Sequence, residues 1–149
     1  MKQREAGFTL LEIIIVLALI GTMCGLSTLF FARGLPDARL NSAARDISSV
    51  IRHARALAQL KREDQIMMID GKGRVYGING QPFKPVPEGV TIETVDPATG
   101  QVSRDARTFR FYATGGQETG SVIVKNKDKA LRVDTDPVAG SVTVKEMRR

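Results

Sequence analysis

One carboxylate stands alone in a long apolar stretch near the N-terminus of this 149-residue chain. Between Phe8 and Phe31, the only ionisable side chains are those of Glu12 and Cys24. About 20 apolar residues, each rising about 1.5 Å, are enough for a helix to cross a hydrocarbon core, so residues 8–32 are predicted to form a transmembrane helix. A carboxylate in such a helix is costly unless a cation neutralises it. The chemistry that Glu12 offers is therefore ion pairing, with a cation supplied by another chain or by a new amine nearby.

The residue types that support catalysis or metal binding are scarce. The only histidine, His53, has no cysteine near it, and the only cysteine, Cys24, lies inside the apolar stretch. Catalytic triads and zinc sites therefore lack their parts. Asp134 and Asp136 could offer oxygens to calcium, but two carboxylates followed by a proline are too few for a site. We predict no enzymatic activity, no cofactor and no metal, with solvent-exposed turn residues at Asp134 and Asp136 and a structural role for His53.

The segment Gly7-Phe8-Thr9-Leu10-Leu11-Glu12, continued by the apolar run 13–19, resembles the class III signal of type IV pilins and type II secretion pseudopilins. The resemblance implies that a prepilin peptidase of the inner membrane cuts between Gly7 and Phe8 and removes residues 1–7 as a leader. It also implies that the new N-terminus at Phe8 is N-methylated. Glu12 would then pair with the N-terminal amine of a neighbouring subunit as the helices bundle into a filament.

Three other interpretations of this segment fit less well. An ordinary secretory signal has an apolar core of about 7–15 residues and an Ala-x-Ala-like cleavage site, and this core is longer. A lipoprotein signal places small residues before its cysteine, whereas Met23 precedes Cys24. A plain membrane anchor gives no reason for Glu12 or for the Gly-Phe-Thr-Leu start.

The remaining residues, 33–149, suffice for one compact globular domain. Gly34 and Pro36 predict a kink or a boundary after the anchor. Apolar residues then recur at three- and four-residue intervals, which is typical of a helix with one buried stripe. We expect this helix from about residue 37 to residue 61. The stripe consists of Leu40, Ala43, Ala44, Ile47, Val50, Ile51, Ala54, Leu57 and Ala58.

From residue 65 to residue 147 the chain is β-rich, with short β-prone runs separated by Gly, Pro, Asp and Asn. The predicted strands are 65–70, 74–78, 90–95, 108–113, 121–125, 131–134 and 141–145. A hairpin turn is expected at residues 70–73, and a mobile loop at residues 95–107. A long helix followed by antiparallel strands predicts an α+β fold. The resemblance implies the same pilin-like plan, a long N-terminal helix packed on antiparallel sheet.

Two later segments are similar to minor pseudopilin H of type II secretion and to the FimT-like minor pilins. One is the strand, glycine turn and strand of residues 109–116 and 120–124, and the other is the helix end at residues 54–58. The resemblance implies a structural subunit with a single-pass inner-membrane anchor and a periplasmic domain, assembled in a pseudopilus. Its implied partners are the prepilin peptidase, the major pseudopilin and the other minor pseudopilins of a tip complex.

The charge of the chain supports an alternative function. The formal net charge is +6, and the basic residues that gather late in the chain are Lys125, Lys127, Lys129, Arg132, Lys145, Arg148 and Arg149. Such a surface could neutralise phosphates, and some FimT-like minor pilins bind DNA for uptake. It could equally be a solvated face or a complement to acidic neighbouring subunits. No aromatic residues alternate with the late lysines to stack on bases.

Overall fold

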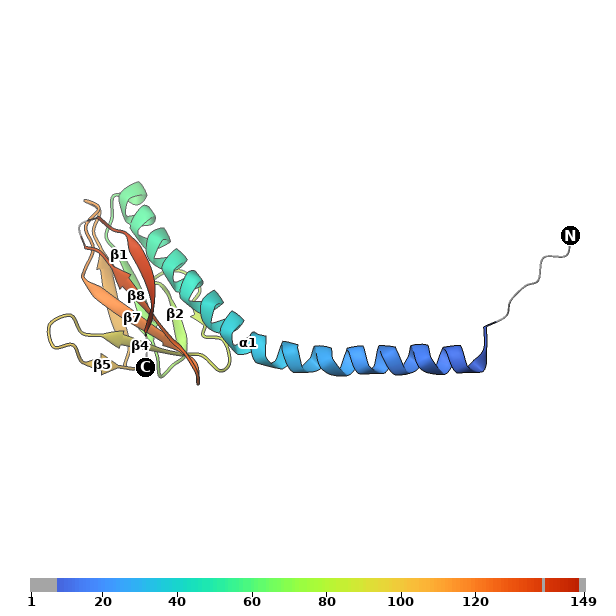
Figure 1. Cartoon of the computed structure of the whole chain (residues 1–149). Helices are drawn as coiled ribbons and strands as arrows, with labels where there is room; N and C mark the ends of the chain where they lie inside the picture. The colour runs from blue at the N-terminus through green and yellow to red at the C-terminus, as the bar shows by residue number, and fades with distance from the viewer. Residues whose placement is uncertain (1–7, 138, 148–149) are drawn as a thin grey trace, which may run out of the picture. The chain divides into compact units, whose positions relative to one another are not determined.

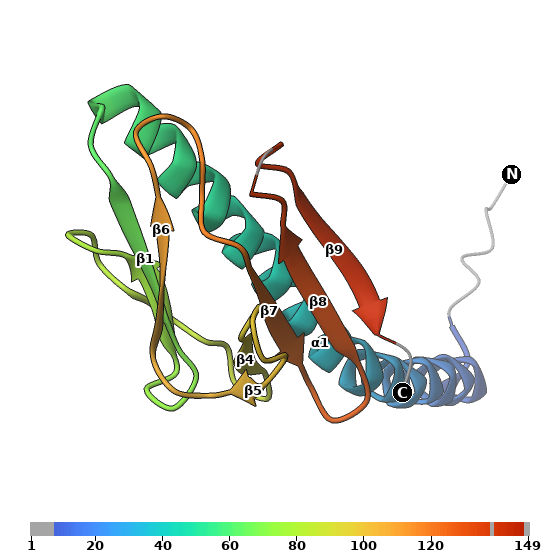
Figure 2. The ribbon, with the colours of Figure 1, turned by 90° about the vertical axis from the view of Figure 1, so that its left-hand side faces the viewer.

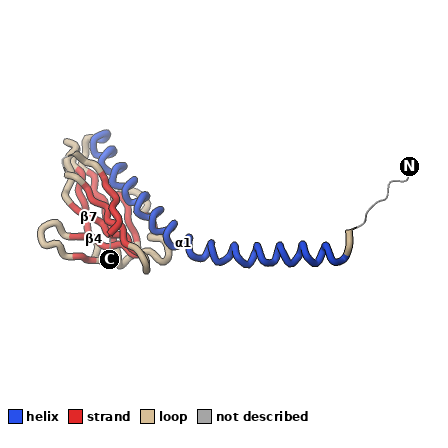
Figure 3. The backbone as a smooth tube through the Cα atoms, viewed as in Figure 1, coloured by secondary structure: helices blue, strands red, loops and turns tan. Residues whose placement is uncertain are grey.

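The structure is a computed structural model that describes residues 8–137 and 139–147, with the side chains of residues 26–34 left out. In these ranges a single long helix precedes all of the strands, as Figure 3 shows by colour. The chain divides into two compact units, residues 1–35 and residues 36–149.

The helix α1 spans Leu10–Lys61. It begins after Thr9, whose Oγ1 accepts a hydrogen bond from the backbone N–H of Glu12 at 3.3 Å, as in a helix N-cap. It ends where Arg62 takes a left-handed φ of 55° and the N–H of Glu63 bonds to the carbonyl of Ala58, a Schellman-type closure. The last residue, Lys61, is the one predicted.

The sequence predicts a kink or a boundary near Pro36, and the structure has no helix boundary there, because α1 continues through that residue. A proline removes one N–H from the helical ladder, and the turns on either side keep their own hydrogen bonds. The separate helix predicted from about residue 37 is therefore the second part of a 52-residue helix. The division between the two compact units nevertheless falls at this proline.

In the first unit, the apolar side chains between Phe8 and Met23 are solvent-exposed around the helix, with Leu10 81% and Leu17 62% exposed. Among the described residues, no helix combines the length and the apolar character needed to cross a membrane. A helix whose apolar side chains are exposed on every side is stabilised by an apolar environment.

The second unit contains two antiparallel sheets. The four-stranded sheet has the order β3-β2-β1-β6, and the five-stranded sheet has the order β5-β4-β7-β8-β9. Figure 1 labels most of these strands, and Figure 2 adds β6 and β9. Their bounds are β1 Gln65–Asp70, β2 Val75–Ile78, β3 Lys84–Pro85, β4 Thr91–Val95, β5 Val102–Ser103, β6 Arg107–Phe111, β7 Gly120–Lys125, β8 Ala130–Thr135 and β9 Val142–Met147.

Both sheets pack on the same stripe of α1, so the second unit has one hydrophobic core. Figure 2 shows the two sheets side by side against this part of the helix. Every predicted stripe residue is buried except Leu57, which is partly buried against the core. The four-stranded sheet contributes Met67, Ile69, Tyr76, Ile78, Phe109 and Phe111, and the five-stranded sheet contributes Ile92, Val122, Val124, Leu131 and Val133. The α+β prediction, with a long helix packed on antiparallel sheet, is thus confirmed.

The seven longer strands are those predicted, to within two residues at each end. The hairpin turn at residues 70–73 is also confirmed, since Asp70 Oδ1 accepts hydrogen bonds from the backbone N–H groups of Lys72 and Gly73. The loop expected at residues 95–107 is partly wrong, because β5 lies within it and pairs with the end of β4. A strand of two residues is too short to show a periodic pattern in sequence.

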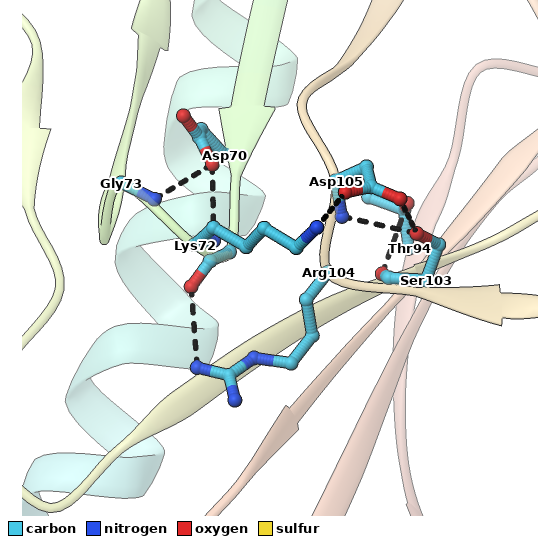
Figure 4. A network of polar contacts seen from close by, with 8 residues as sticks. Asp70, Lys72, Gly73, Thr94, Ser103, Arg104 and Asp105 are labelled. Atoms are coloured by element: carbon cyan, nitrogen blue, oxygen red, sulfur yellow. Dashed lines mark hydrogen bonds and ion pairs between the residues drawn. The ribbon is translucent and has the colours of Figure 1, made fainter.

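The β1–β2 turn is fixed to the segment before β6, as Figure 4 shows. The backbone N–H of Lys72 donates to the carbonyl of Arg104 at 2.9 Å, and the ammonium of Lys72 pairs with Asp105 at 2.5 Å. This hydrogen-bonded ion pair lowers the pKa of the Asp105 carboxyl and raises the pKa of Lys72. Both side chains are mostly exposed, so the ion pair adds little stability, and the backbone contacts fix the turn.

Gly71 is the position in this turn that allows the close approach. A Cβ there would overlap the carbonyl oxygen of Ile92 and lie 3.0 Å from the carbonyl oxygen of Arg104. Because both neighbours are backbone atoms, no rotamer change relieves the overlap, and we expect Gly71→Ala to lower the free energy of unfolding by about 2–3 kcal/mol. Chemical denaturation measures this loss. Gly116→Ala is the control, since its Cβ would meet Tyr112 at an ordinary 3.7 Å, and equal stability of the two variants would contradict the prediction.

Candidate assembly site and basic surface

Glu12 lies in the first turn of α1 and is solvent-exposed. Its position three residues after the capping Thr9 is that of an acid in a capping box, and a carboxylate is favourable near the positive end of the helix dipole. The side chains that follow it, from Ile13 to Leu17, are apolar and exposed. The structure thus places one accessible carboxylate at the head of an apolar helix, where it can meet a cation from outside the chain.

Of the two residues that flank the predicted cleavage site, the structure describes Phe8 and not Gly7. Gly7 and the rest of the leader, residues 1–7, lie outside the described residues. Phe8 is the first described residue, precedes the helix, and is 79% exposed. The predicted N-methylation of Phe8 therefore stays a prediction.

Three of the late basic residues are paired with carboxylates. Lys125 pairs with Glu93 at 2.6 Å across β4 and β7, and Lys129 pairs with Asp37 at 2.8 Å. The hydrogen bond from Lys129 lowers the pKa of the Asp37 carboxyl, and Asp37 in turn raises the pKa of Lys129. Part of the predicted basic surface is therefore neutralised within the chain.

Arg132 is the third paired residue. Its Nε donates to Asp134 Oδ1 at 2.7 Å, and its Nη2 donates to Ser121 Oγ at 3.0 Å. The Ser121 hydroxyl also donates to Asp134 Oδ1 at 2.6 Å. Burial acts to raise the pKa of the Asp134 carboxyl, but these hydrogen bonds outweigh it and lower the pKa. Asp134 is thus engaged with the chain's own donors.

The remaining late basic residues are Lys127, Lys145, Arg148 and Arg149, and the charge of Lys145 contributes to the lowered pKa of Asp134. Lys127 is exposed in the β7–β8 turn, and Lys145 is exposed on β9, opposite Arg132 in the strand register. Arg148 and Arg149 lie outside the described residues. Nothing in the sequence near the lysines pointed to their partners, because Asp37 and Glu93 are remote along the chain.

The β7–β8 turn also contacts the start of the second unit through Asn126. Its Nδ2 donates to the carbonyl of Pro36 at 3.4 Å and to Asp37 Oδ1 at 3.3 Å. Together with the Lys129–Asp37 pair, these contacts attach the turn to α1 at residues 36 and 37.

No metal centre is formed by the residues that the structure describes, where no three His, Cys, Asp or Glu side chains gather in a suitable group. Asp136 Oδ1 accepts the backbone N–H of Ala139 at 2.8 Å, as a turn residue does. His53 is exposed on α1, beside a shallow cavity of about 280 Å³ that Ser49 and Gly77 also line.

Comparisons with known proteins identify a matching motif and a relative of this chain. Residues 2–28 match the model of the prokaryotic N-terminal methylation motif. Type II secretion system protein H of Xanthomonas campestris pv. campestris is 26% identical over 141 residues, which cover 95% of this chain and 83% of that relative. The chain is a minor pseudopilin of the type II secretion system. A minor pseudopilin with this motif is anchored to the inner membrane, is a structural protein rather than an enzyme, and has other pseudopilus subunits as partners.

The fold of this pseudopilin agrees with that of a solved relative. The minor pseudopilin EpsH from the type 2 secretion system of Vibrio cholerae superposes with a TM-score of 0.57 at 12% sequence identity, covering 72% of this chain and 97% of the EpsH chain. At this identity the similarity shows the shared fold. It supports the architecture of one long helix with antiparallel sheets.

Proposed function

We propose that this pseudopilin is cut between Gly7 and Phe8, methylated at Phe8, and drawn from the inner membrane into a periplasmic pseudopilus that helps export folded proteins. Residues 8–32 form its single membrane-spanning anchor, and the second unit lies in the periplasm. Its partners are the prepilin peptidase, the major pseudopilin and the other minor pseudopilins of the tip complex. Most of the association energy comes from apolar helix packing, and Glu12 sets the register.

The observation that carries this proposal is the exposed carboxylate of Glu12 at the head of an exposed apolar helix. Packing of such helices removes Glu12 from water, and a buried carboxylate is penalised unless a cation pairs with it. The amine created at Phe8 of a neighbouring subunit is such a cation. Because this chain keeps Glu12, it can also dock beneath a subunit above it.

The alternative, a FimT-like minor pilin that binds DNA, has less support. Lys125, Lys129 and Arg132 are paired with acidic side chains, which leaves fewer free cations for phosphates than the sequence suggested. Binding of duplex DNA by the full-length chain, lost on neutralising Lys127 and Lys145, would favour the alternative.

Co-expression with an active prepilin peptidase tests the proposed function. We expect intact-mass analysis of the purified chain to show loss of residues 1–7 and addition of one methyl group at Phe8. A chain that keeps its leader beside an active peptidase would refute the proposal. Affinity capture of the co-expressed major and minor pseudopilins provides the second readout.

A further inference from the structure

The face of α1 opposite the core carries two arginines that have no partner in the described part of the chain. Arg45 and Arg52 are exposed and seven residues apart, so they lie on the same face about 10.5 Å from each other along the helix axis. Neither forms a hydrogen bond or an ion pair with any described residue. Ser42, Ser49 and Ala56 continue the same exposed face.

The two acids of this part of the helix are engaged with other residues. Asp46 accepts hydrogen bonds from Tyr76 and Lys84, both at 2.7 Å, and Asp37 is paired with Lys129. These are the only two acids of the helix between residues 36 and 61. The exposed face is therefore basic, and no acid of its own helix neutralises it.

A cavity of about 380 Å³ lies beside Arg45, between α1 and the five-stranded sheet. Ala44 and Leu131 line it with Val144, which is 41% exposed, and Asn41, Arg45 and Glu146 complete the lining. Arg45 thus lies beside a cavity whose exposed apolar side chain is Val144. Protein–protein interfaces favour such an arrangement, because an apolar anchor can cover the apolar side chain while the guanidinium takes a carboxylate.

We propose that this face docks an acidic helical surface of another pseudopilus subunit, with carboxylates at Arg45 and Arg52 and one apolar side chain in the cavity beside Val144. The inference rests on the proposed function, which supplies neighbouring subunits. Duplex DNA fits the face less well, since a phosphate backbone makes no use of the apolar recess, and several cations that would extend the contact are paired internally.

The test uses the full-length chain, co-expressed with the other pseudopilins of the same secretion system and captured in detergent. We expect R45E/R52E to lower the yield of one captured pseudopilin at least tenfold, while wild-type capture weakens at high salt. K127E/K145E is the matched control, because it changes the net charge equally at exposed positions that are not on α1 and do not line the cavity. The milder R45Q/R52Q variant should change capture in the same direction. Unchanged thermal unfolding of all three variants shows that the fold is intact.

A charge swap tests the contact directly: an acid of the captured pseudopilin is replaced with lysine and this variant is co-expressed with R45E/R52E. Restored capture would support the inference. Wild-type capture by R45E/R52E, or an equal loss in K127E/K145E, would overturn the inference while leaving the proposed function in place. If R45E/R52E loses binding to a duplex DNA probe but keeps its pseudopilins, the face is a nucleic-acid surface and the inference is wrong. Failure of the wild-type chain to capture any pseudopilin would refute both proposals.

Discussion

Replacing Gly7 with leucine is expected to leave this pseudopilin as an uncleaved precursor in the membrane. The scissile bond follows Gly7 in the class III signal that the sequence resembles, and a branched side chain there crowds the peptidase at the bond to be cut. We expect nearly complete loss of processing in the presence of active peptidase. Intact-mass analysis and N-terminal sequencing of the membrane fraction measure it.

The matched control for this variant is Gly21→Leu, which makes the same change further along the chain. A Cβ at Gly21 meets no atom within 4 Å, so the substitution adds no clash within the described chain. We expect normal cleavage of Gly21→Leu. Normal cleavage of Gly7→Leu would show that the peptidase does not act at this bond.

Glu12→Ala is expected to leave insertion and cleavage intact and to reduce incorporation into the pseudopilus by a factor of ten or more. Loss of the carboxylate leaves the neighbouring amine without its partner among apolar helices, and breaking a buried ion pair in this way costs about 3–5 kcal/mol. Quantifying the chain in sheared pseudopili, relative to its amount in the membrane, measures the effect.

Glu12→Gln separates the charge from the size of the side chain. Glutamine fills the same space and still accepts a hydrogen bond, but it cannot form an ion pair. We expect it to assemble as poorly as the alanine variant. Assembly of Glu12→Gln at the wild-type level would show that the charge of Glu12 has no role in register.

The parts of the fold that the sequence predicted are those with a local pattern. The stripe from Leu40 to Ala58 repeats with the helical period, and the longer strands are bounded by glycine, proline, aspartate or asparagine. In β1 the side chain of Met67 is buried and that of Met68 is only partly so, which fits the alternation expected of a strand.

The parts that sequence patterns could not predict depend on contacts distant along the chain. β6 and β7 follow one another yet belong to different sheets, and the crossing relies on Gly120, where a Cβ would overlap the ring of Phe109. The continuation of α1 through Pro36 is a balance between one missing hydrogen bond and many intact ones. Likewise, the partners of Lys125 and Lys129 lie 32 and 92 residues away, so the charged surface could not be read from composition.

The attachment of the β7–β8 turn to residues 36 and 37 has a mechanical consequence if the subunit is drawn out of the membrane. Tension that enters the second unit at Pro36 is divided between the helical ladder and the contacts of Asn126 and Lys129. The five-stranded sheet thereby bears part of the tension directly at residues 36 and 37. Without these contacts, the tension would reach the sheet only through the packing of the core. Resistance to forced unfolding is governed by the unfolding rate. We therefore expect these few polar contacts to affect the unfolding rate under force more than the equilibrium free energy of unfolding.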